Sequence, residues 1–540
     1  MIASSPLKTN YKQMKKIKYI GIVLVFVLAS SSCKKVIEID PISNVGTESF
    51  YRNYAETNAA LTGCYNGLQE PLYNEWMFTE LRSDNAKQGS TGSTAVPNTE
   101  LNELDMYTLN ASHDKVYDYW LATYKNIRAI NYVLRGLGIK YANGQLVYGE
   151  ATAVMTEAQK KQIAGEALFL RAYHYFELVR LFGGVFAVTE PVDPKTAKQI
   201  NRNSLTECYA LIMADLIAAK DLLSNKPFAQ ISQADYGRAN SWAAKALLAK
   251  VYLTTGQKGD ALPLLDDVII NSGYGLLPSY TDVFSINNEM NKEILFAVRY
   301  KSGGFGLGSP FANLFAPTSS GNSVVNNDGS GYNFPTESLI AAFKTPTTGS
   351  SDARKSINIA TFSGRPYVKK FLSQVTTKFD AENDFPVMRF ADVLLMKAEA
   401  LGYDGATGVS VSIINQIRER AGATNYTTGD FNIAFYKYPA TGANAIADAA
   451  SFKTALFNER RVELAFENQR YFDILRSGDA LAIIRNHYAQ EYEAHYKNYR
   501  PVITLAELQG YVTQDRLLLP IPQREIDTND QIKIPQNSGY

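Results

Sequence analysis

Apolar residues recur at helical spacing through most of this chain, and this period constrains its fold more than any other feature. Ser204 and Glu207 open one such run, in which Leu205, Ile212 and Leu216 return to one face. A serine and a glutamate at this spacing form a capping box, in which side chains satisfy backbone donors at the start of a helix. Similar patterns occupy 166–182, 391–402 and 409–421. The sequence therefore predicts a mainly α protein.

Small residues indicate how one pair of these helices packs. The spacing over 243–252 predicts a helix, and Gly256 suits the position just beyond its end. Ala249 and Ala261 match the small positions of a tetratricopeptide helix pair and would let two helices approach closely. The helical patterns show no clean period of about 34 residues. We therefore expect divergent helix pairs in an irregular array.

The N-terminal segment has the order of regions found in a secretory signal. Lysines up to Lys18 precede the apolar run 19–29, and small residues then lead to Cys33. The run is too short for a membrane span, which takes about 20 apolar residues. A cysteine at this place resembles the lipobox of bacterial lipoproteins. We expect 1–32 to be a signal peptide with its natural start at Met14, and Cys33 to be lipidated; the alternative is an ordinary cleaved signal.

Charge and cysteine content exclude some classes of protein. The formal net charge is +1, and removing the five lysines of 1–32 takes it to −4. A chain without a basic surplus is not expected to bind nucleic acid. Apolar residues make up 46% of the sequence, enough for a large core. Only Cys64 and Cys208 follow Cys33, so disulfides are not expected to hold the fold, although one bridge between the two stays open.

Two long segments differ in composition from the segments with a helical pattern. Residues 82–98 and 302–335 are rich in Gly, Ser, Asn and Pro. The second also carries aromatic residues, which a disordered linker seldom has. Because loops of this length are usually functional or disordered, the aromatics favour a functional role.

Charged and aromatic residues alternate densely over 458–476. Glu467, Arg470, Asp473 and Arg476 recur at three-residue steps with alternating sign, so we expect one charged ladder on a single helix. The interleaved aromatics indicate that part of it is buried and fully paired. A catalytic role is not expected, because each carboxylate has a cation beside it, whereas a general acid needs a raised pKa.

A set of motifs follows the order seen in a known family. They are Ile39-Asp40-Pro41, Trp120 with Tyr124, Phe169-Leu170-Arg171, and the stretches 389–400, 415–422, 458–476 and 519–526. Together they resemble the SusD/RagB family of Bacteroidetes outer-membrane nutrient-binding lipoproteins. The resemblance implies a scaffold of four tetratricopeptide-like units, with loops and minor strands forming the ligand face. It implies one domain over 33–540, with an N-terminal half at about 33–230 and a C-terminal half at about 270–540.

The resemblance also implies a function. Such a protein binds oligosaccharides without turning them over and delivers them to a TonB-dependent outer-membrane transporter. Two alternatives stay open: an oligopeptide-binding member of the same family, and a surface hydrolase. We find no catalytic residue, cofactor motif or metal site that would support the hydrolase.

By the same resemblance, the ligand is held beside the loop after the early helices and by aromatics from the middle of the chain. Those regions correspond to Asp84 and Asn85, and to the segment from Tyr300 through Phe311 and Tyr332 to Asn333. The polar side chains would bind sugar hydroxyls, and the rings would stack on sugar faces. The alternative is that Phe311 packs in the core and Asp84 caps a helix.

Two other patterns could hold a metal. The segment from Asn326 to Glu337 has the oxygen spacing of a calcium loop, but Pro335 interrupts it and a polar turn is the favoured interpretation. His487, Glu491 and His495 follow at four-residue steps, and we interpret them as a solvated helix face. We therefore expect no metal and no cofactor.

Overall fold

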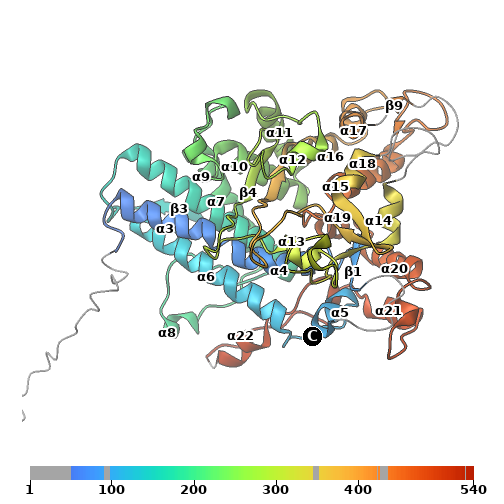
Figure 1. Cartoon of the computed structure of the whole chain (residues 1–540). Helices are drawn as coiled ribbons and strands as arrows, with labels where there is room; N and C mark the ends of the chain where they lie inside the picture. The colour runs from blue at the N-terminus through green and yellow to red at the C-terminus, as the bar shows by residue number, and fades with distance from the viewer. Residues whose placement is uncertain (1–49, 90–97, 344–351, 423, 426–435, 530) are drawn as a thin grey trace, which may run out of the picture. The chain divides into compact units, whose positions relative to one another are not determined.

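Helices make up most of the structure, a computed structural model that describes residues 50–89, 98–343, 352–422, 424–425, 436–529 and 531–540 (Figure 1). The expected signal peptide, 1–32, and the expected lipidation site, Cys33, lie outside the described residues. Residues 51–540 form one compact unit.

The helices of the first half of the chain include the long ones of the scaffold. They are α3 (Tyr54–Asn66), α4 (Gln69–Thr79), α5 (Thr99–Asp105), α6 (Asp114–Gly136), α7 (Glu157–Phe182), α8 (Pro194–Ala197), α9 (Leu205–Leu222), α10 (Ser241–Thr254), α11 (Lys258–Asn271) and α12 (Tyr280–Val283). The helices of the second half are mostly shorter. They are α13 (Phe311–Phe315), α14 (Glu337–Ala342), α15 (Ala353–Asn358), α16 (Phe390–Leu401), α17 (Val409–Arg420), α18 (Ala449–Glu463), α19 (Arg470–Ser477), α20 (Ala480–Glu491), α21 (Leu505–Tyr511) and α22 (Gln523–Thr528).

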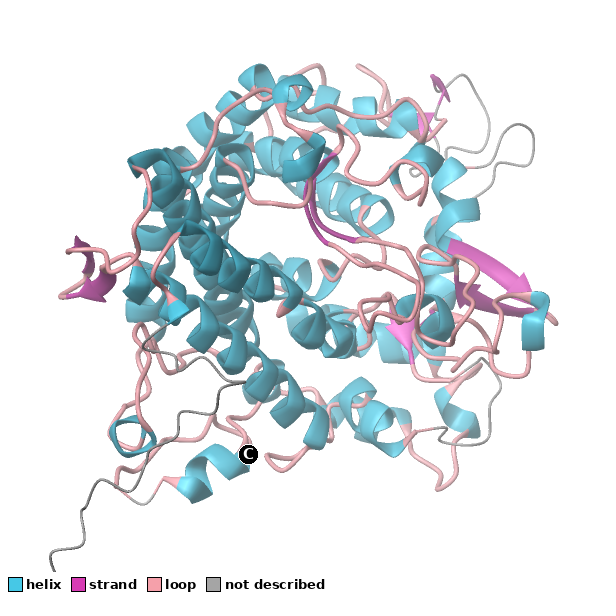
Figure 2. Cartoon of the chain, turned by 60° about the vertical axis from the view of Figure 1, so that its left-hand side comes forward, coloured by secondary structure: helices cyan, strands magenta, loops and turns pink. Residues whose placement is uncertain are grey.

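The described strands are short and lie in separate two-stranded sheets (Figure 2). The antiparallel pairs are β1 (Ala86–Lys87) with β5 (Phe334–Pro335), β2 (Ile139–Ala142) with β3 (Gln145–Tyr148), β4 (Ile294–Val298) with β8 (Phe385–Arg389), and β6 (Ile359–Phe362) with β7 (Arg365–Val368). The parallel pair is β9 (Thr424–Asn425) with β10 (Tyr436–Lys437).

Successive helices pack side by side and bury a common core. Contacts run from α6 to α7, α9, α10, α11, α16 and α17 in turn. The sequence signals for this scaffold are confirmed. Ser204 and Glu207 form the capping box of α9, and Ala249 and Ala261 are fully buried in the adjoining helices α10 and α11. Gly256 follows α10 with φ 80°, in the left-handed region that glycine enters without strain.

The prediction of one charged ladder over 458–476 is wrong. The chain leaves the helix after Glu463 and re-enters it at Arg470, with positive φ at Phe466 and Asn468. The four charged side chains therefore reach separate partners, apart from one Asp473–Arg476 pair at 2.7 Å. The expected burial and pairing are confirmed: Glu467, for example, binds Arg389 at 2.7 Å.

Buried ion pairs tie the C-terminal helices together. Arg354 and Arg389 are shielded from solvent, and both contact Glu463, at 3.2 and 3.1 Å. The pairs extend to Lys370, Arg418, Arg420, Asp352, Glu293, Glu459 and Glu467. Because a buried charge is stabilised only when it is paired, this cluster couples α15, α17 and α18 to β8.

The two cysteines of the described part, Cys64 and Cys208, are buried and free. The bridge between them that the sequence left open does not form. Among the described helices, none has the length and the apolar character needed to cross a bilayer.

Candidate ligand-binding groove

The structure brings together the two segments in which ligand contacts were expected. Strand β1 pairs with β5, so that Ala86 faces Pro335. Next to this pairing, the Thr336 backbone N–H donates to the Asn85 carbonyl at 3.0 Å. The loop after the early helices and the end of the 302–335 segment are therefore neighbours.

Asp84 and Asn85 nevertheless point into the protein. Arg470 holds the Asp84 carboxylate through two hydrogen bonds of 2.7 and 2.9 Å. Arg461 lies 3.4 Å from the same carboxylate and donates to the Asn85 side chain at 2.9 Å. Burial alone would raise the pKa of Asp84, but Arg461 and Arg470 outweigh it, so the pKa lies below its usual range. The protein itself binds the Asp84 carboxylate and the Asn85 Oδ1 atom, whereas the buried Asn85 Nδ2 atom has no partner among the described residues.

Phe311 and Tyr332 differ in their surroundings. Phe311 is buried and packs against the rings of Phe371 and Phe385, with centroids 5.8 and 5.3 Å away. Tyr332 is partly buried and stacks on Trp76, at 6.2 Å and an interplanar angle of 18°. Contact of Asp84, Asn85 and Phe311 with a ligand stays a prediction, and the groove described next does not include them.

Tyr300 is one of the residues that line a groove of about 690 Å³ between α4, α6 and the segment from Tyr300 to Pro310. Its lining is mostly polar and comprises Gly63, Asn66, Gly67, Gln69, Glu70, Tyr73, Asn74, Lys115, Asp118, Leu121, Ala122, Lys125, Asn126, Ala129, Tyr300, Gly306, Gly308 and Pro310. Gln69 fixes the facing segment to α4, because its side-chain amide donates to the Arg299 carbonyl at 2.7 Å. The groove therefore has two walls that are bonded to each other.

Two polar atoms of the groove lining have no partner among the described residues. Tyr300 and Asn74 are each 5% exposed, and neither the Tyr300 hydroxyl nor the Asn74 Oδ1 atom makes a hydrogen bond. A buried polar atom without a partner costs about 1–3 kcal/mol. Both atoms are buried in the wall of the groove, with almost no surface open to solvent.

Tyr73 is an aromatic residue of this groove that the sequence did not single out. Its ring is 40% exposed. Burial raises the pKa of the Tyr73 phenol, and Lys115 partly offsets that effect. Tyr73 is one turn before Trp76 and Met77 on α4, and every residue of that helix from Asn74 to Thr79 is buried. An exposed aromatic on such a helix can be recognised only once the facing loop is known.

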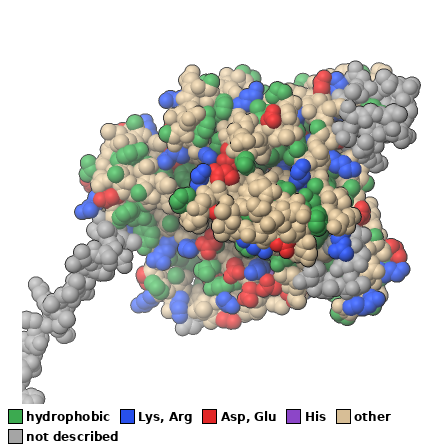
Figure 3. All heavy atoms as spheres, viewed as in Figure 1, with side chains coloured by type: hydrophobic (Ala, Val, Ile, Leu, Met, Phe, Trp, Pro, Cys, Tyr) green, Lys and Arg blue, Asp and Glu red, His purple; other side chains and the backbone are tan. Residues whose placement is uncertain are grey.

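The Gly-rich start of the 302–335 segment forms one rim of the groove. Asp380 accepts hydrogen bonds from the backbone N–H groups of Gly303 and Gly304, at 2.9 and 2.8 Å. Gly303 has φ 120°, which other residues rarely adopt. Phe305 projects from this rim and is 70% exposed. On the face drawn in Figure 3, a broad area near the centre is mostly backbone and uncharged polar side chains.

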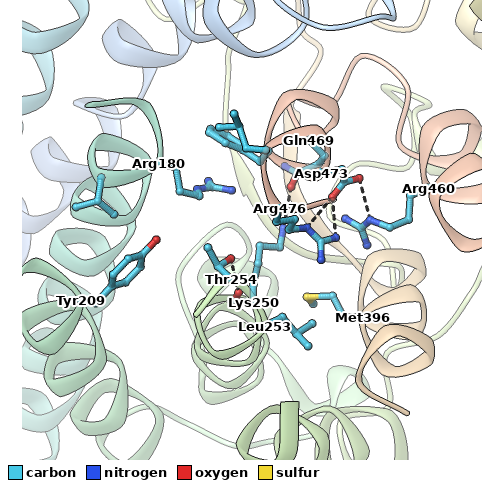
Figure 4. A pocket seen from close by; sticks show the side chains of 13 residues that line it. Arg180, Tyr209, Lys250, Leu253, Thr254, Met396, Arg460, Gln469, Asp473 and Arg476 are labelled. Atoms are coloured by element: carbon cyan, nitrogen blue, oxygen red, sulfur yellow. Dashed lines mark hydrogen bonds and ion pairs between the residues drawn. The ribbon is translucent and has the colours of Figure 1, made fainter. Parts of the chain in front are cut away.

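A second cavity, of about 210 Å³, lies among α7, α9, α10, α16, α18 and α19 (Figure 4). Its charged side chains already bind one another or neighbouring acids. Arg460 and Arg476 both contact Asp473, at 2.8 and 2.7 Å, and Lys250 contacts Asp392 at 2.7 Å. Because these charges are paired, the cavity is better explained by packing than by ligand binding.

The two metal interpretations have different outcomes. Asp328 accepts hydrogen bonds from the backbone of Gly321 and Gly329, as expected of a polar turn, and Glu337 instead begins α14. The solvated face expected for His487, Glu491 and His495 is wrong: all three are buried, and Glu491 pairs with Lys87 at 2.5 Å. Within the described residues, no group of three metal-binding side chains converges.

Two family models match most of the chain. One, described as the SusD family, matches residues 322–540, and the other, described as starch-binding and associating with the outer membrane, matches residues 43–253. The chain belongs to the SusD/RagB family. This confirms the resemblance seen in the sequence motifs. Association with the outer membrane is part of the family description.

Several relatives of this SusD/RagB protein span its length. SusD-like protein P2 of Formosa agariphila is 28% identical, over 98% of this chain and 100% of its own. SusD-like protein P25 of the same organism is 24% identical, over 97% and 100%. The starch-binding protein SusD of Bacteroides thetaiotaomicron is 30% identical, but over only 28% of this chain and 27% of its own.

Solved structures confirm the mainly α fold. A laminarin-binding SusD-like protein superposes with a TM-score of 0.71 at 23% identity, covering 91% of this chain and 100% of its own. Surface glycan-binding protein A from Bacteroides thetaiotaomicron, in complex with laminarihexaose, gives a TM-score of 0.67 at 17% identity, covering 89% and 99%. The names of these proteins state binding and no reaction.

Proposed function

We propose that this SusD/RagB protein binds oligosaccharides in the groove between α4, α6 and the segment from Tyr300 to Pro310. The observation that carries the proposal is the groove itself, in which polar side chains such as Asn66 and Gln69 adjoin the exposed Tyr73. A sugar hydroxyl both donates and accepts, so adjacent hydroxyls can bind amide side chains of this kind. Tyr73 supplies a partly exposed ring face for the C–H face of a sugar.

The charges of the groove support binding without turnover. Glu70 pairs with Lys125 at 3.1 Å, and Asp118 lies 3.8 Å from Lys115. Hydrolysis of a glycosidic bond usually needs two carboxyl groups, one of which is protonated to act as an acid. Each of these two carboxylates instead faces a lysine, an arrangement that does not favour the hydrolase alternative.

Relatives named for starch, laminarin and other glycans support an oligosaccharide as the ligand class. Tyr332 stacks on Trp76 of α4, the helix that also carries Tyr73. We include it with Tyr300 among the proposed contacts.

We further propose that the protein is anchored to the outer membrane through a lipid on Cys33 and delivers its ligand to a TonB-dependent transporter. The signal-like order of 19–33 and the family's association with the outer membrane support this. Co-purification of such a transporter with the wild-type chain, from membranes solubilised in mild detergent, tests the partner. Its absence from the eluate, with the protein folded, would contradict delivery.

Calorimetry on the full mature chain tests the groove. Titrations with laminarin, starch and xylan oligosaccharides should find a binding ligand, and Tyr73→Ala should weaken that ligand at least tenfold. Tyr300→Phe removes only the unpartnered hydroxyl and should weaken binding about threefold to tenfold. Tyr148→Ala, a change at an exposed tyrosine on β3 away from the groove, is the matched control.

Three results would count against this proposal. Binding that survives both groove variants places the site elsewhere. Binding of oligopeptides but of no sugar assigns the protein to the peptide-binding alternative. Release of shorter sugars during the titration, detected by chromatography, would show a hydrolase.

A further inference from the structure

A separate cavity of about 360 Å³ lies between α6, the segment around α8, and α22. Figure 1 shows where these helices lie. Its lining is mainly apolar and includes three aromatic rings, those of Trp120, Tyr124 and Phe186. It shares with the proposed sugar groove only the partly exposed Leu121 of α6. No part of the proposed function uses it.

The three rings meet at steep angles and form adjoining walls. Trp120 and Phe186 are nearly perpendicular, with centroids 5.9 Å apart and an interplanar angle of 87°. Tyr124 lies 4.8 Å from Trp120 and 6.5 Å from Phe186. The Tyr124 hydroxyl donates to the Phe186 carbonyl at 2.9 Å, which fixes the ring in place. The aromatic wall is thus held rigid before any ligand arrives.

A carboxylate completes this cavity. Glu525, on α22, lines it and is partly buried. Among the described residues, no cation lies within ion-pair distance of Glu525. Arg524, beside it in the sequence, points away, because it pairs with Asp114 at 3.2 Å and lies over the Tyr117 ring. Burial raises the pKa of Glu525, which agrees with a carboxylate that lacks a counter-ion.

Aromatic faces beside an unpaired carboxylate are the arrangement that recognises an organic cation. Ring faces attract ammonium groups, and the attraction grows when the site is shielded from water. The apolar walls would contact the alkyl part of such a ligand. Lys198 also lines the cavity and has the same positive charge as such a ligand. The ligand's nitrogen is therefore expected at the Glu525 end of the cavity.

We infer that the cavity between α6, α8 and α22 binds an organic ammonium ion, with its charge against Glu525 and its alkyl groups against Trp120, Tyr124 and Phe186. The ammonium could belong to a free small molecule or to a lysine side chain of another protein. Both sources have the same chemistry, and the experiment below separates them.

Calorimetry with two probes of equal shape tests the inference. Choline carries a quaternary ammonium, and 3,3-dimethyl-1-butanol has the same outline without the charge. The full mature chain should bind choline at least tenfold more tightly than the alcohol. Glu525→Gln keeps the side chain's size and should remove that preference. Asp527→Asn, an equal charge change at an exposed position of the same helix, should retain it.

A second arm identifies the source of the ammonium. If a lysine-containing tripeptide binds more tightly than choline, and its ε-acetylated form does not bind, the cavity takes a lysine side chain of a partner. Equal binding of choline and the alcohol, no binding of any cationic probe at millimolar concentration, or unchanged choline affinity in Glu525→Gln would each overturn the inference. Because Tyr73→Ala should bind choline like the wild type, failure here is separable from failure of the sugar groove.

Discussion

Replacing Arg470 by alanine tests whether Asp84 is part of the structure or part of a ligand site. In the folded protein, Arg470 binds Asp84 through two hydrogen bonds and also donates to the Phe457 carbonyl at 3.2 Å. Its guanidinium lies 3.8 Å from the centre of the Phe457 ring. Both charged side chains are almost completely buried. Arg470 therefore links α18 and α19 to the segment that leads into β1.

The magnitude follows from what the change leaves behind. Removing one partner of a buried ion pair typically costs about 3–5 kcal/mol, because the other charge stays buried without compensation. Here Arg461 remains 3.4 Å from the Asp84 carboxylate and offsets part of that cost. We expect Arg470→Ala to lower the free energy of unfolding by about 2–4 kcal/mol. The double variant with Asp84→Ala should lose less than the sum of the two single changes.

Urea unfolding followed by near-ultraviolet circular dichroism measures these differences. Lys497→Ala is the control, because the exposed Lys497–Glu493 pair should contribute less than about 1 kcal/mol. Sugar affinity, measured on the folded variants, should not change. The reasoning is refuted if Arg470→Ala unfolds like the wild type, or if Asp84→Ala weakens sugar binding without loss of stability. The second result would show that Asp84 takes part in sugar binding.

Three further changes test other parts of the structure. Burial raises the pKa of Glu80 to about 8, so its contribution to stability is present below pH 4.5 and is lost as the pH rises through about 8. Glu80→Gln should therefore make the free energy of unfolding depend less on pH across that range. A pH dependence identical to that of the wild type would contradict this prediction. Tyr300→Phe should leave the free energy of unfolding unchanged or raise it, because the lost hydroxyl has no partner among the described residues. A decrease of more than about 1 kcal/mol in urea unfolding would show that this hydroxyl does make a hydrogen bond in the folded protein. Cys33→Ala should move the protein from the membrane to the soluble fraction, and unchanged fractionation would disprove lipid anchoring.

Local signals in the sequence predicted the scaffold well. A capping box needs only residues three apart, so Ser204 and Glu207 defined the start of α9 before any packing was known. Gly256 likewise marked the end of α10, because a left-handed residue closes a helix by its own backbone conformation. The three-residue spacing over 458–476 predicted one continuous helix, but it gave no sign that the helix is interrupted around Phe466. Glu467 turns toward Lys370 and Arg389, and those distant partners decide the break.

The ligand site was predicted as two regions, and only the regions could be inferred. The paired β1 and β5 do bring those regions together. The polar and aromatic side chains chosen within them, such as Asp84 and Phe311, are suited equally to a core and to a sugar site. Which role each has depends on partners far away in the sequence, such as Arg470 and Phe371. Tyr73 was overlooked because its exposure depends on the loop that faces α4.

The sequence by itself determined the helical scaffold and the family, since helix period, caps and ordered motifs are properties of neighbouring residues. Only the tertiary structure decided which polar groups are satisfied internally. Glu491 and His495 show this: helical spacing suggested a solvated face, yet Lys87 and the Gln88 carbonyl, some 400 residues earlier in the chain, enclose them. Conversely, the Tyr300 hydroxyl and Asn74 Oδ1 are left without partners in the buried wall of a groove. Burial and pairing depend on contacts between distant segments, and a local pattern does not contain them.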